Sequence, residues 1–282
     1  MHIRIGYDIV VNVPVPTPAL LMLSVRPERA RDMIAPDTLA VDPSLPVHEF
    51  VDTFGNRCAR LTLPEGSTRL YANAIVKDSG LLDEVDWLAP QVGIANLPDD
   101  ALQFLLSSRY CEVDEMIPIA WDLFGYTQPG WGRVQAICNW VNQHVAFDYA
   151  KARPTKTALN VYTERVGVCR DFTHLAVTFC RAMNIPARYC NGYLGDIGIA
   201  PVDLPMDFNA WFEVYLGGRW YTFDARHNEP RIGRVLIARG RDAADIPMIT
   251  TYGSQTLERF VVHTEEMPEA NIPLFKPLAS VS

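Results

Sequence analysis

The chain has 282 residues, which corresponds to about two domains at roughly 150 residues per domain. Its hydrophobic fraction of 49% and charged fraction of 21% are ordinary for a folded protein and exclude a disordered or collagen-like chain. The formal charge of −8, with no basic cluster, argues against nucleic acid or an anionic membrane as a partner. A transmembrane helix needs about 20 consecutive apolar residues, and the sequence has no such run.

The N-terminus and the cysteines bear on the cellular compartment. The opening MHIRIGYDIVVNVPVPTP has no basic stretch followed by an unbroken apolar segment and a cleavage site, so we expect it to begin the fold. No two of the cysteines at positions 58, 111, 138, 169, 180 and 190 are spaced as C-x-x-C, which disfavours a redox pair or a zinc ribbon. Reduced thiols without an export signal predict a cytoplasmic location.

Residues 1–100 predict an antiparallel β domain, sandwich-like in form. Apolar residues alternate along one face of the first strand, and turn-rich segments separate several further short apolar runs. These runs are Ala19–Val25, His48–Thr53, Cys58–Leu63 and Leu70–Lys77. Many short strands without long helical patterns are typical of a sandwich.

Residues 101–265 predict a second domain of the α+β class. Asp99 or Asp100 is a candidate cap for a helix that starts near Ala101. A second helix is predicted over 131–145, where apolar residues recur at helical spacing. The segment 266–282 contains three prolines and predicts an irregular tail.

The most informative segment is GVCRDFTHL, at residues 167–175. Apolar residues at 172, 175, 176, 179, 180 and 183 form one helical stripe, and Cys169 extends it by one step toward the N-terminus. Cys169 therefore lies in the first turn, where free N–H groups and the helix dipole stabilise a thiolate or an oxyanion. Position alone also fits a buried structural cysteine. A core role is expected for Cys138, Cys180 and Cys190.

A hairpin further along the chain brings two more candidate residues together. Gly217-Gly218 separates two alternating strands and predicts a two-residue turn in which Leu216 pairs with Arg219. Asp224 then lies opposite Trp211, and Asn209 is its diagonal neighbour on the same face. A helix-start cysteine, a hairpin residue and a carboxylate form the layout of a thiol enzyme, except that the position of the base is Asn.

These segments resemble the transglutaminase-like superfamily, in its bacterial cysteine-protease-like branch. The resemblance rests on GVCRDFTHLAVTFCRAMNIPARYCNGYL and MDFNAWFEVYLGGRWYTFDARHN and extends from about residue 131 to 245. It implies a papain-like transglutaminase core preceded by a β-rich domain. It also implies a Cys-His-Asp triad with Cys169 as nucleophile, Asp224 as acid and Asn209 in place of the histidine. The implied activity is amide acyl transfer to water or to an amine, with a peptide or protein amide as substrate.

Asn209 makes the activity of this chain an open question. An amide has no basic nitrogen and cannot exchange a proton with Cys169, and the loss of acid–base catalysis costs roughly 10²–10⁴-fold in rate. Without an imidazolium, the pKa of the thiol should rise toward that of free cysteine. Three explanations compete. The chain is a deliberately inactivated variant, a natural pseudoenzyme that keeps the cleft for binding, or an enzyme with another base.

His227 is the candidate for that other base, because it follows Asp224 by three residues and could lie near the cleft. His174 is expected on the solvent side of its helix as a structural residue. Trp211 is either a wall of the cleft or ordinary packing. Arg170 and Asp171 are expected to hold the helix start by ionic contacts. The mechanism requires no cofactor or metal, and no segment resembles a calcium loop. A purely structural module is the weakest hypothesis, since it leaves the convergence of Cys169, Asn209 and Asp224 without a reason.

Overall fold

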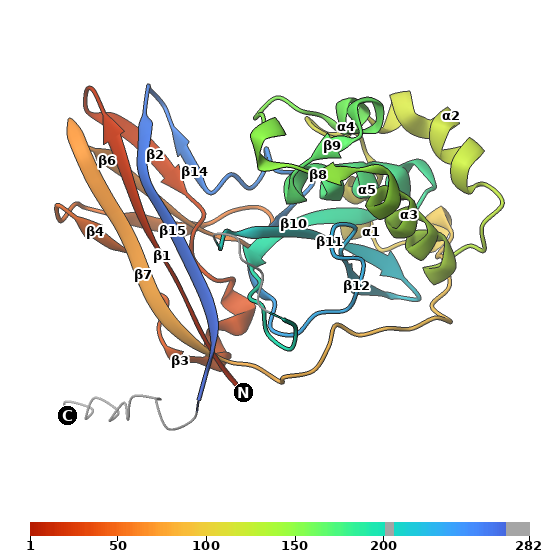
Figure 1. Ribbon diagram of the computed structural model, residues 1–282, viewed down its shortest axis with the longest axis horizontal. Coiled ribbons are helices and arrows are strands. Elements are labelled where there is room, and N and C mark those ends of the chain that lie inside the picture. Colours follow the sequence, from red (N-terminus) through yellow and green to blue (C-terminus); the bar gives the residue numbers. More distant parts are fainter. Residues whose placement is uncertain (201–205, 269–282) are drawn as a thin grey trace.

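The computed structural model describes residues 1–200 and 206–268. The chain forms a β-rich part and a part in which helices cover a sheet (Figure 1). The predicted α+β class is therefore confirmed. Within the described ranges, no helix combines the length and the apolar character needed to cross a membrane.

Two antiparallel sheets make up the β-rich part. The larger has the strand order β15-β1-β7-β3, with β4 also paired to β7. Its strands are β1 (His2–Val13), β3 (Met33–Ala35), β4 (Ala40–Asp42), β7 (Gly66–Lys77) and β15 (Thr256–Met267). The smaller, in the order β14-β2-β6-β5, contains β2 (Thr17–Leu21), β5 (His48–Val51), β6 (Arg57–Leu63) and β14 (Ile249–Thr251).

The alternation along β1 explains how these sheets pack. The side chains of Ile3, Ile5 and Ile9 are at most 1% exposed, and they share one core with Leu21 and Leu63 of the smaller sheet. Residues two apart on a strand point to the same face, so a single alternating pattern supplies this buried face. The sandwich-like arrangement expected for the N-terminal region is confirmed.

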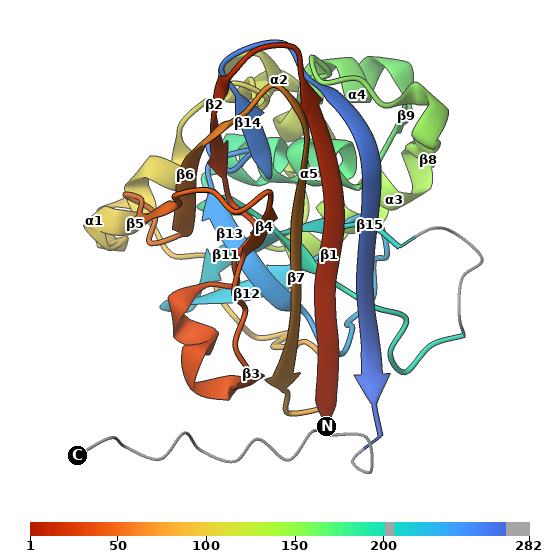
Figure 2. The ribbon, with the colours of Figure 1, turned by 90° about the vertical axis from the view of Figure 1, so that its left-hand side faces the viewer.

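The last strands of the chain return to the β-rich part. β15 pairs with β1 from His2↔Met267 to Asn12↔Thr256, and β14 pairs with β2. Figure 2 shows β15 beside β1, on the side opposite β7. The predicted boundary at residue 265 does not hold for these strands, which belong to the sheets of the first part. The predicted irregular tail starts inside β15, and its residues 269–282 lie outside the described residues.

The second part places helices on one face of a four-stranded antiparallel sheet (Figure 1). The sheet has the order β12-β11-β10-β13 and contains β10 (Ala187–Tyr193), β11 (Asn209–Leu216), β12 (Arg219–Phe223) and β13 (Val235–Gly240). The helices are α1 (Asp99–Leu102), α2 (Val113–Phe124), α3 (Trp131–His144), α4 (Ala158–Glu164) and α5 (Cys169–Ala182). A two-stranded parallel sheet joins β8 (Ala146–Phe147) to β9 (Val166–Gly167).

Two predicted helices are present, with small differences at their ends. The helix expected over 131–145 is α3. The helix expected near Ala101 is the four-residue α1, which begins at Asp99 without a side-chain cap, so the capping prediction is wrong.

The sheet β10–β13 takes part in two hydrophobic cores. Phe212, Val214 and Phe223 pack with the helices, whereas Tyr193 and Ile237 pack with the β-rich part. A sheet with both faces covered forms the middle layer between two apolar clusters. The relative position of the two parts is therefore set by burial.

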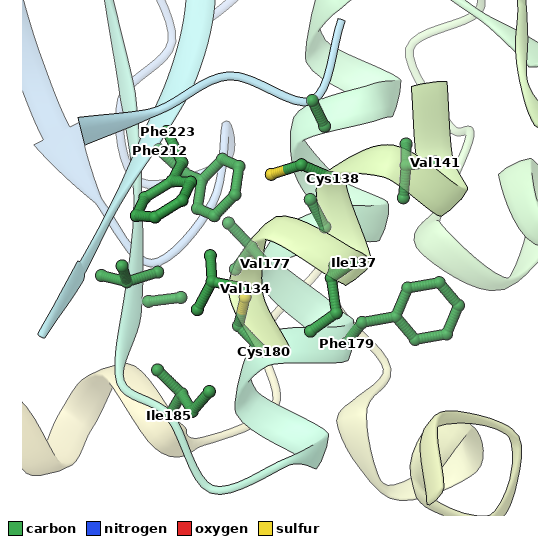
Figure 3. Close-up of a cluster of buried hydrophobic side chains, with 14 of the residues drawn as sticks. Val134, Ile137, Cys138, Val141, Val177, Phe179, Cys180, Ile185, Phe212 and Phe223 are labelled. Atoms are coloured by element: carbon green, nitrogen blue, oxygen red, sulfur yellow. The ribbon is translucent and has the colours of Figure 1, made fainter. Parts of the chain in front are cut away.

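Helix α5 lies at the centre of the second part. Every residue from Asp171 to Ala182 is buried, because α2, α3, α4 and the sheet all pack against this helix. Figure 3 shows the cluster that α5 forms with α3 and with the sheet residues Phe212 and Phe223. The predicted stripe is correct, but the opposite side of the helix is covered as well. Cys138 and Cys180 are buried in this core, as expected, and Cys190 is also fully buried.

The pairing of β15 with β1 can be tested by two adjacent substitutions. Val262 is 4% exposed in the core of the β-rich part, whereas Val261 on the same strand is 44% exposed. We expect Val262→Asp to lower the free energy of unfolding by about 3 kcal/mol or more, since it buries an unpaired charge. Val261→Asp should cost less than about 1 kcal/mol. Urea unfolding measures the free energy of unfolding of both variants. An equal decrease in the two variants would contradict the position of β15.

Candidate active site

The segment before α5 fixes the position of Cys169. Strand β9 pairs in parallel with β8, and Val168 then holds an extended conformation directly before the first helical residue. A Cβ on Gly167 would lie 2.6 Å from Cβ of Asp171, so only glycine fits there. The Asp171 carboxylate accepts the Val168 N–H at 3.0 Å and pairs with Arg170, which confirms the predicted ionic contacts at the helix start.

The thiol of Cys169 is partly buried beside a cavity of about 380 Å³. The cavity is lined by residues of the α5 start, β10 and the beginning of β11, including Tyr189 and Ala210. Burial raises the pKa of Cys169 to about 11, although the nearby Arg226 guanidinium and the Ala210 and Arg170 backbone N–H groups favour the thiolate. The thiol is therefore largely protonated at neutral pH. The sequence predicts a pKa near that of free cysteine, and burial places it above that value.

Asn209 lies on the wall of the same cavity, at the first residue of β11. Its Nδ2 donates to the carbonyl oxygens of Leu194 at 3.3 Å and Asp207 at 3.2 Å, and its Oδ1 accepts from Arg226 at 3.3 Å. These contacts hold the amide in place. They supply no group that could take a proton from Cys169.

The predicted hairpin register is confirmed. Gly217 and Gly218 have φ values of 56° and 95°, as a type I′ turn requires, and Leu216 pairs with Arg219. The ladder ends at the pair Phe212↔Phe223, one residue before Asp224.

The carboxylate of Asp224 is buried, and each of its two oxygens accepts two hydrogen bonds. Its Oδ1 accepts the backbone N–H groups of Arg226 and His227, both at 3.0 Å. Its Oδ2 accepts from His227 Nδ1 at 2.8 Å and from the Arg234 guanidinium at 3.0 Å. Burial alone would raise the pKa of this carboxyl, but Arg234 and His227 hold it well below its ordinary value. A carboxylate offers about four acceptor sites, and all are used here.

The three predicted site residues are therefore only partly brought together. Cys169 and Asn209 share a cavity, whereas no hydrogen bond joins Asn209 to Asp224 among the described contacts. Arg226 forms the link instead, because its backbone N–H bonds Asp224 while its guanidinium bonds Asn209. The expected contact between position 209 and the carboxylate is absent since other donors already occupy Asp224.

His227 is the imidazole that bonds Asp224. It lines a cavity of about 260 Å³ that shares Asp207 and Asn209 with the cavity beside Cys169. Its Nδ1 is bonded to Asp224. The His–Asp contact of a triad is thus present in this chain, but it is made by His227.

Two other predicted positions, Trp211 and His174, are buried. Trp211 is 2% exposed, lies beneath the Arg234 guanidinium, and is absent from the described residues that line the Cys169 cavity. His174 is fully buried and stacks on Tyr110, and its Nε2 accepts from the Ala243 N–H. The expectation that His174 faces solvent is wrong, because α5 is covered on all sides.

Sequence reasoning misses three residues that shape this site. Arg226 carries the positive charge beside Cys169, Asp207 adds a negative one, and Arg234 neutralises Asp224. Arg226 lies only two residues after Asp224, which could have drawn attention to it. Arg234 lies ten residues after Asp224 and carries no local signal.

The state of the Cys169 thiol can be tested by its reaction with iodoacetamide. Because burial raises its pKa to about 11, the alkylation rate should rise about tenfold per pH unit between pH 7 and pH 10. Mass spectrometry measures the rate, and Cys169→Ala identifies the reacting thiol, since the other five cysteines are buried. A rate that levels off below pH 8 would contradict a raised pKa.

The charge on Asp224 should contribute to stability. Asp224→Asn leaves the buried Arg234 with Asp83 as its remaining carboxylate partner, and we expect a loss of about 2–3 kcal/mol at pH 7. Because the folded pKa is lowered, this contribution is complete above pH ~4, the unfolded pKa, and disappears as the pH falls further.

A matched control is Asp8→Asn, which removes partly exposed ion pairs with Arg69 and Arg259. It should cost less than about 1 kcal/mol. Urea unfolding of both variants at pH 7 and at pH values below 4 makes the comparison. An equal decrease in the free energy of unfolding of the two variants at pH 7 would contradict the role given to Asp224.

Comparison with known proteins shows the family of this chain. The model of the transglutaminase-like superfamily matches residues 122–225, which include Cys169, Asn209 and Asp224. The crystal structure of a candidate cysteine protease from Cytophaga hutchinsonii is 30% identical, covers 98% of this chain and 94% of its own, and superposes with a TM-score of 0.83. An uncharacterized protein of Mycobacterium leprae is 22% identical over 213 residues, 72% of this chain and 75% of that protein. An uncharacterized Mycobacterium tuberculosis protein is 33% identical over 112 residues, 36% of each chain. The chain belongs to the transglutaminase-like superfamily.

Proposed function

We propose that this chain is built for thiol-dependent amide acyl transfer at Cys169, and that Asn209 holds its activity at a low level. The observation that carries the proposal is the position of the thiol. Cys169 begins α5 and lies beside a cavity, with the Ala210 and Arg170 backbone N–H groups near its sulfur. Family membership and the likeness to a candidate cysteine protease support an enzyme of this class.

The reaction would proceed through a thioester. The Cys169 sulfur attacks the amide carbonyl carbon, the C–N bond breaks, and the leaving amine takes up the proton that the thiol gives up. Water or a second amine then attacks the thioester and restores the thiol. Backbone N–H groups at the helix start would stabilise the oxyanion. Hydrolysis would make the protein a peptidase or amidase, and an amine acceptor would make it a transglutaminase.

A peptide or protein amide is the substrate class that the cavity supports. Phe208, Met248 and Phe260 give it apolar walls, and Arg153 and Asp207 add charged groups. This mixture suits a peptide segment whose side chains pack on the walls beside the scissile amide.

Binding without catalysis is the second candidate function. Two observations favour it, the raised pKa of Cys169 and the engagement of Asn209 by the carbonyl oxygens of Leu194 and Asp207. A protein of this kind would keep the cavity and hold a peptide without cleaving it.

Substitution at position 209 separates the two functions. Asn209→His should raise amide cleavage or amine incorporation by roughly 10²–10⁴-fold, because an imidazole can exchange protons with Cys169. The double variant N209H/H227A should gain more than N209H alone, since His227→Ala removes the donor that now bonds the Oδ2 of Asp224. A peptide library with a small primary amine, analysed by mass spectrometry, measures both reactions.

Three control variants decide which residues carry any activity that is measured. Cys169→Ala should abolish activity in every background, and Asn96→His, on an exposed residue outside the site, should change nothing. Activity of the native chain that His227→Asn removes would identify His227 as the base and contradict the role given to Asn209. Inactivity of N209H and N209H/H227A, with an unchanged pH dependence of Cys169 alkylation, would favour the binding function.

A further inference from the structure

A separate cavity of about 360 Å³ lies on another side of Asp224 and shares no lining residue with the cavity beside Cys169. Its walls come from the segment between β7 and α1, from α3, and from the end of β12 with the residues that follow. Figure 1 shows that segment running from the end of β7 across to the helical part. A ligand in this cavity would not contact the Cys169 thiol.

Aromatic rings form the floor and the rim of this cavity. Trp131 is 3% exposed, and its ring centroid lies 4.5 Å from that of Phe223. Trp87 packs against Trp131 at 6.0 Å and is 66% exposed. An indole face attracts a cation placed within about 6 Å of the ring centroid.

The walls also carry a negative charge. Four carboxylates line the cavity, and no lysine, arginine or histidine is among the described lining residues. Arg234 bonds Asp83 and Asp224 from outside the lining, and Arg219 bonds Glu84. The Arg231 guanidinium also interacts electrostatically with Glu229 and Asp224. Four carboxylates against three guanidinium groups leave a net charge of −1.

We propose that this cavity binds the ammonium group of a small organic cation. The aromatic faces of Trp87 and Trp131 and the uncompensated carboxylate charge attract the cation. The same charge disfavours anions, and a neutral molecule of equal shape gains only from apolar contact.

A charged ligand and its neutral isostere test the proposal. Choline and 3,3-dimethyl-1-butanol have nearly the same shape and the same hydroxyl group, but only choline carries a charge. Isothermal titration calorimetry and ligand-observed NMR with the full chain should detect saturable binding of choline, and binding of the alcohol at least about fivefold weaker. Equal affinities, or no saturable choline binding by either method, would overturn the proposal.

Three variants test whether choline binds in this cavity. Trp87→Leu keeps an apolar side chain but removes the aromatic face, and should weaken choline binding about three- to fivefold. Glu229→Gln should weaken it about two- to threefold through the lost charge. Trp121→Leu, on an exposed residue of α2 that does not line the cavity, is the matched control and should leave the affinity unchanged. Unchanged affinity in both W87L and E229Q would also overturn the proposal.

Discussion

The buried carboxylate of Asp224 is the constraint on which the rest of the candidate site depends. A charge removed from water must be compensated, and here the Arg234 guanidinium, the His227 imidazole and two backbone N–H groups do so. Because these partners use all the acceptor sites, no site is left for a side chain at position 209. Asn209 is linked to Asp224 through Arg226 instead.

The layered fold explains why the thiol remains accessible although its helix is buried. α5 belongs to the core beneath the helices, whereas Cys169 packs against the core of the β-rich part. The first residue of the helix thus lies between two hydrophobic clusters. Arg226 completes the setting, since its guanidinium packs on Phe147 of β8 and bonds Asn209. The cationic group beside the sulfur is an arginine, which cannot act as a base at neutral pH.

Much of this arrangement is encoded locally and could be predicted from the sequence. The Gly217-Gly218 turn determines the hairpin register, and the stripe from Phe172 onward determines where α5 begins. The pairing of β15 with β1 joins residues about 260 positions apart, and no local pattern specifies it. The partners of Asp224 could not be predicted either. Tertiary packing alone decides between position 209, His227 and Arg234, because all three can bond a carboxylate.

The tautomer of His227 tests the central claim most directly. Nitrogen-15 NMR of the imidazole rings in the native chain near neutral pH, with His227→Asn for assignment, reports which ring nitrogen carries a proton. We expect a protonated Nδ1 with a hydrogen-bonded proton signal that Asp224→Ala removes. A neutral His227 ring protonated on Nε2, or an Nδ1 signal that is the same in D224A, would contradict the claim that His227 occupies Asp224 in place of residue 209.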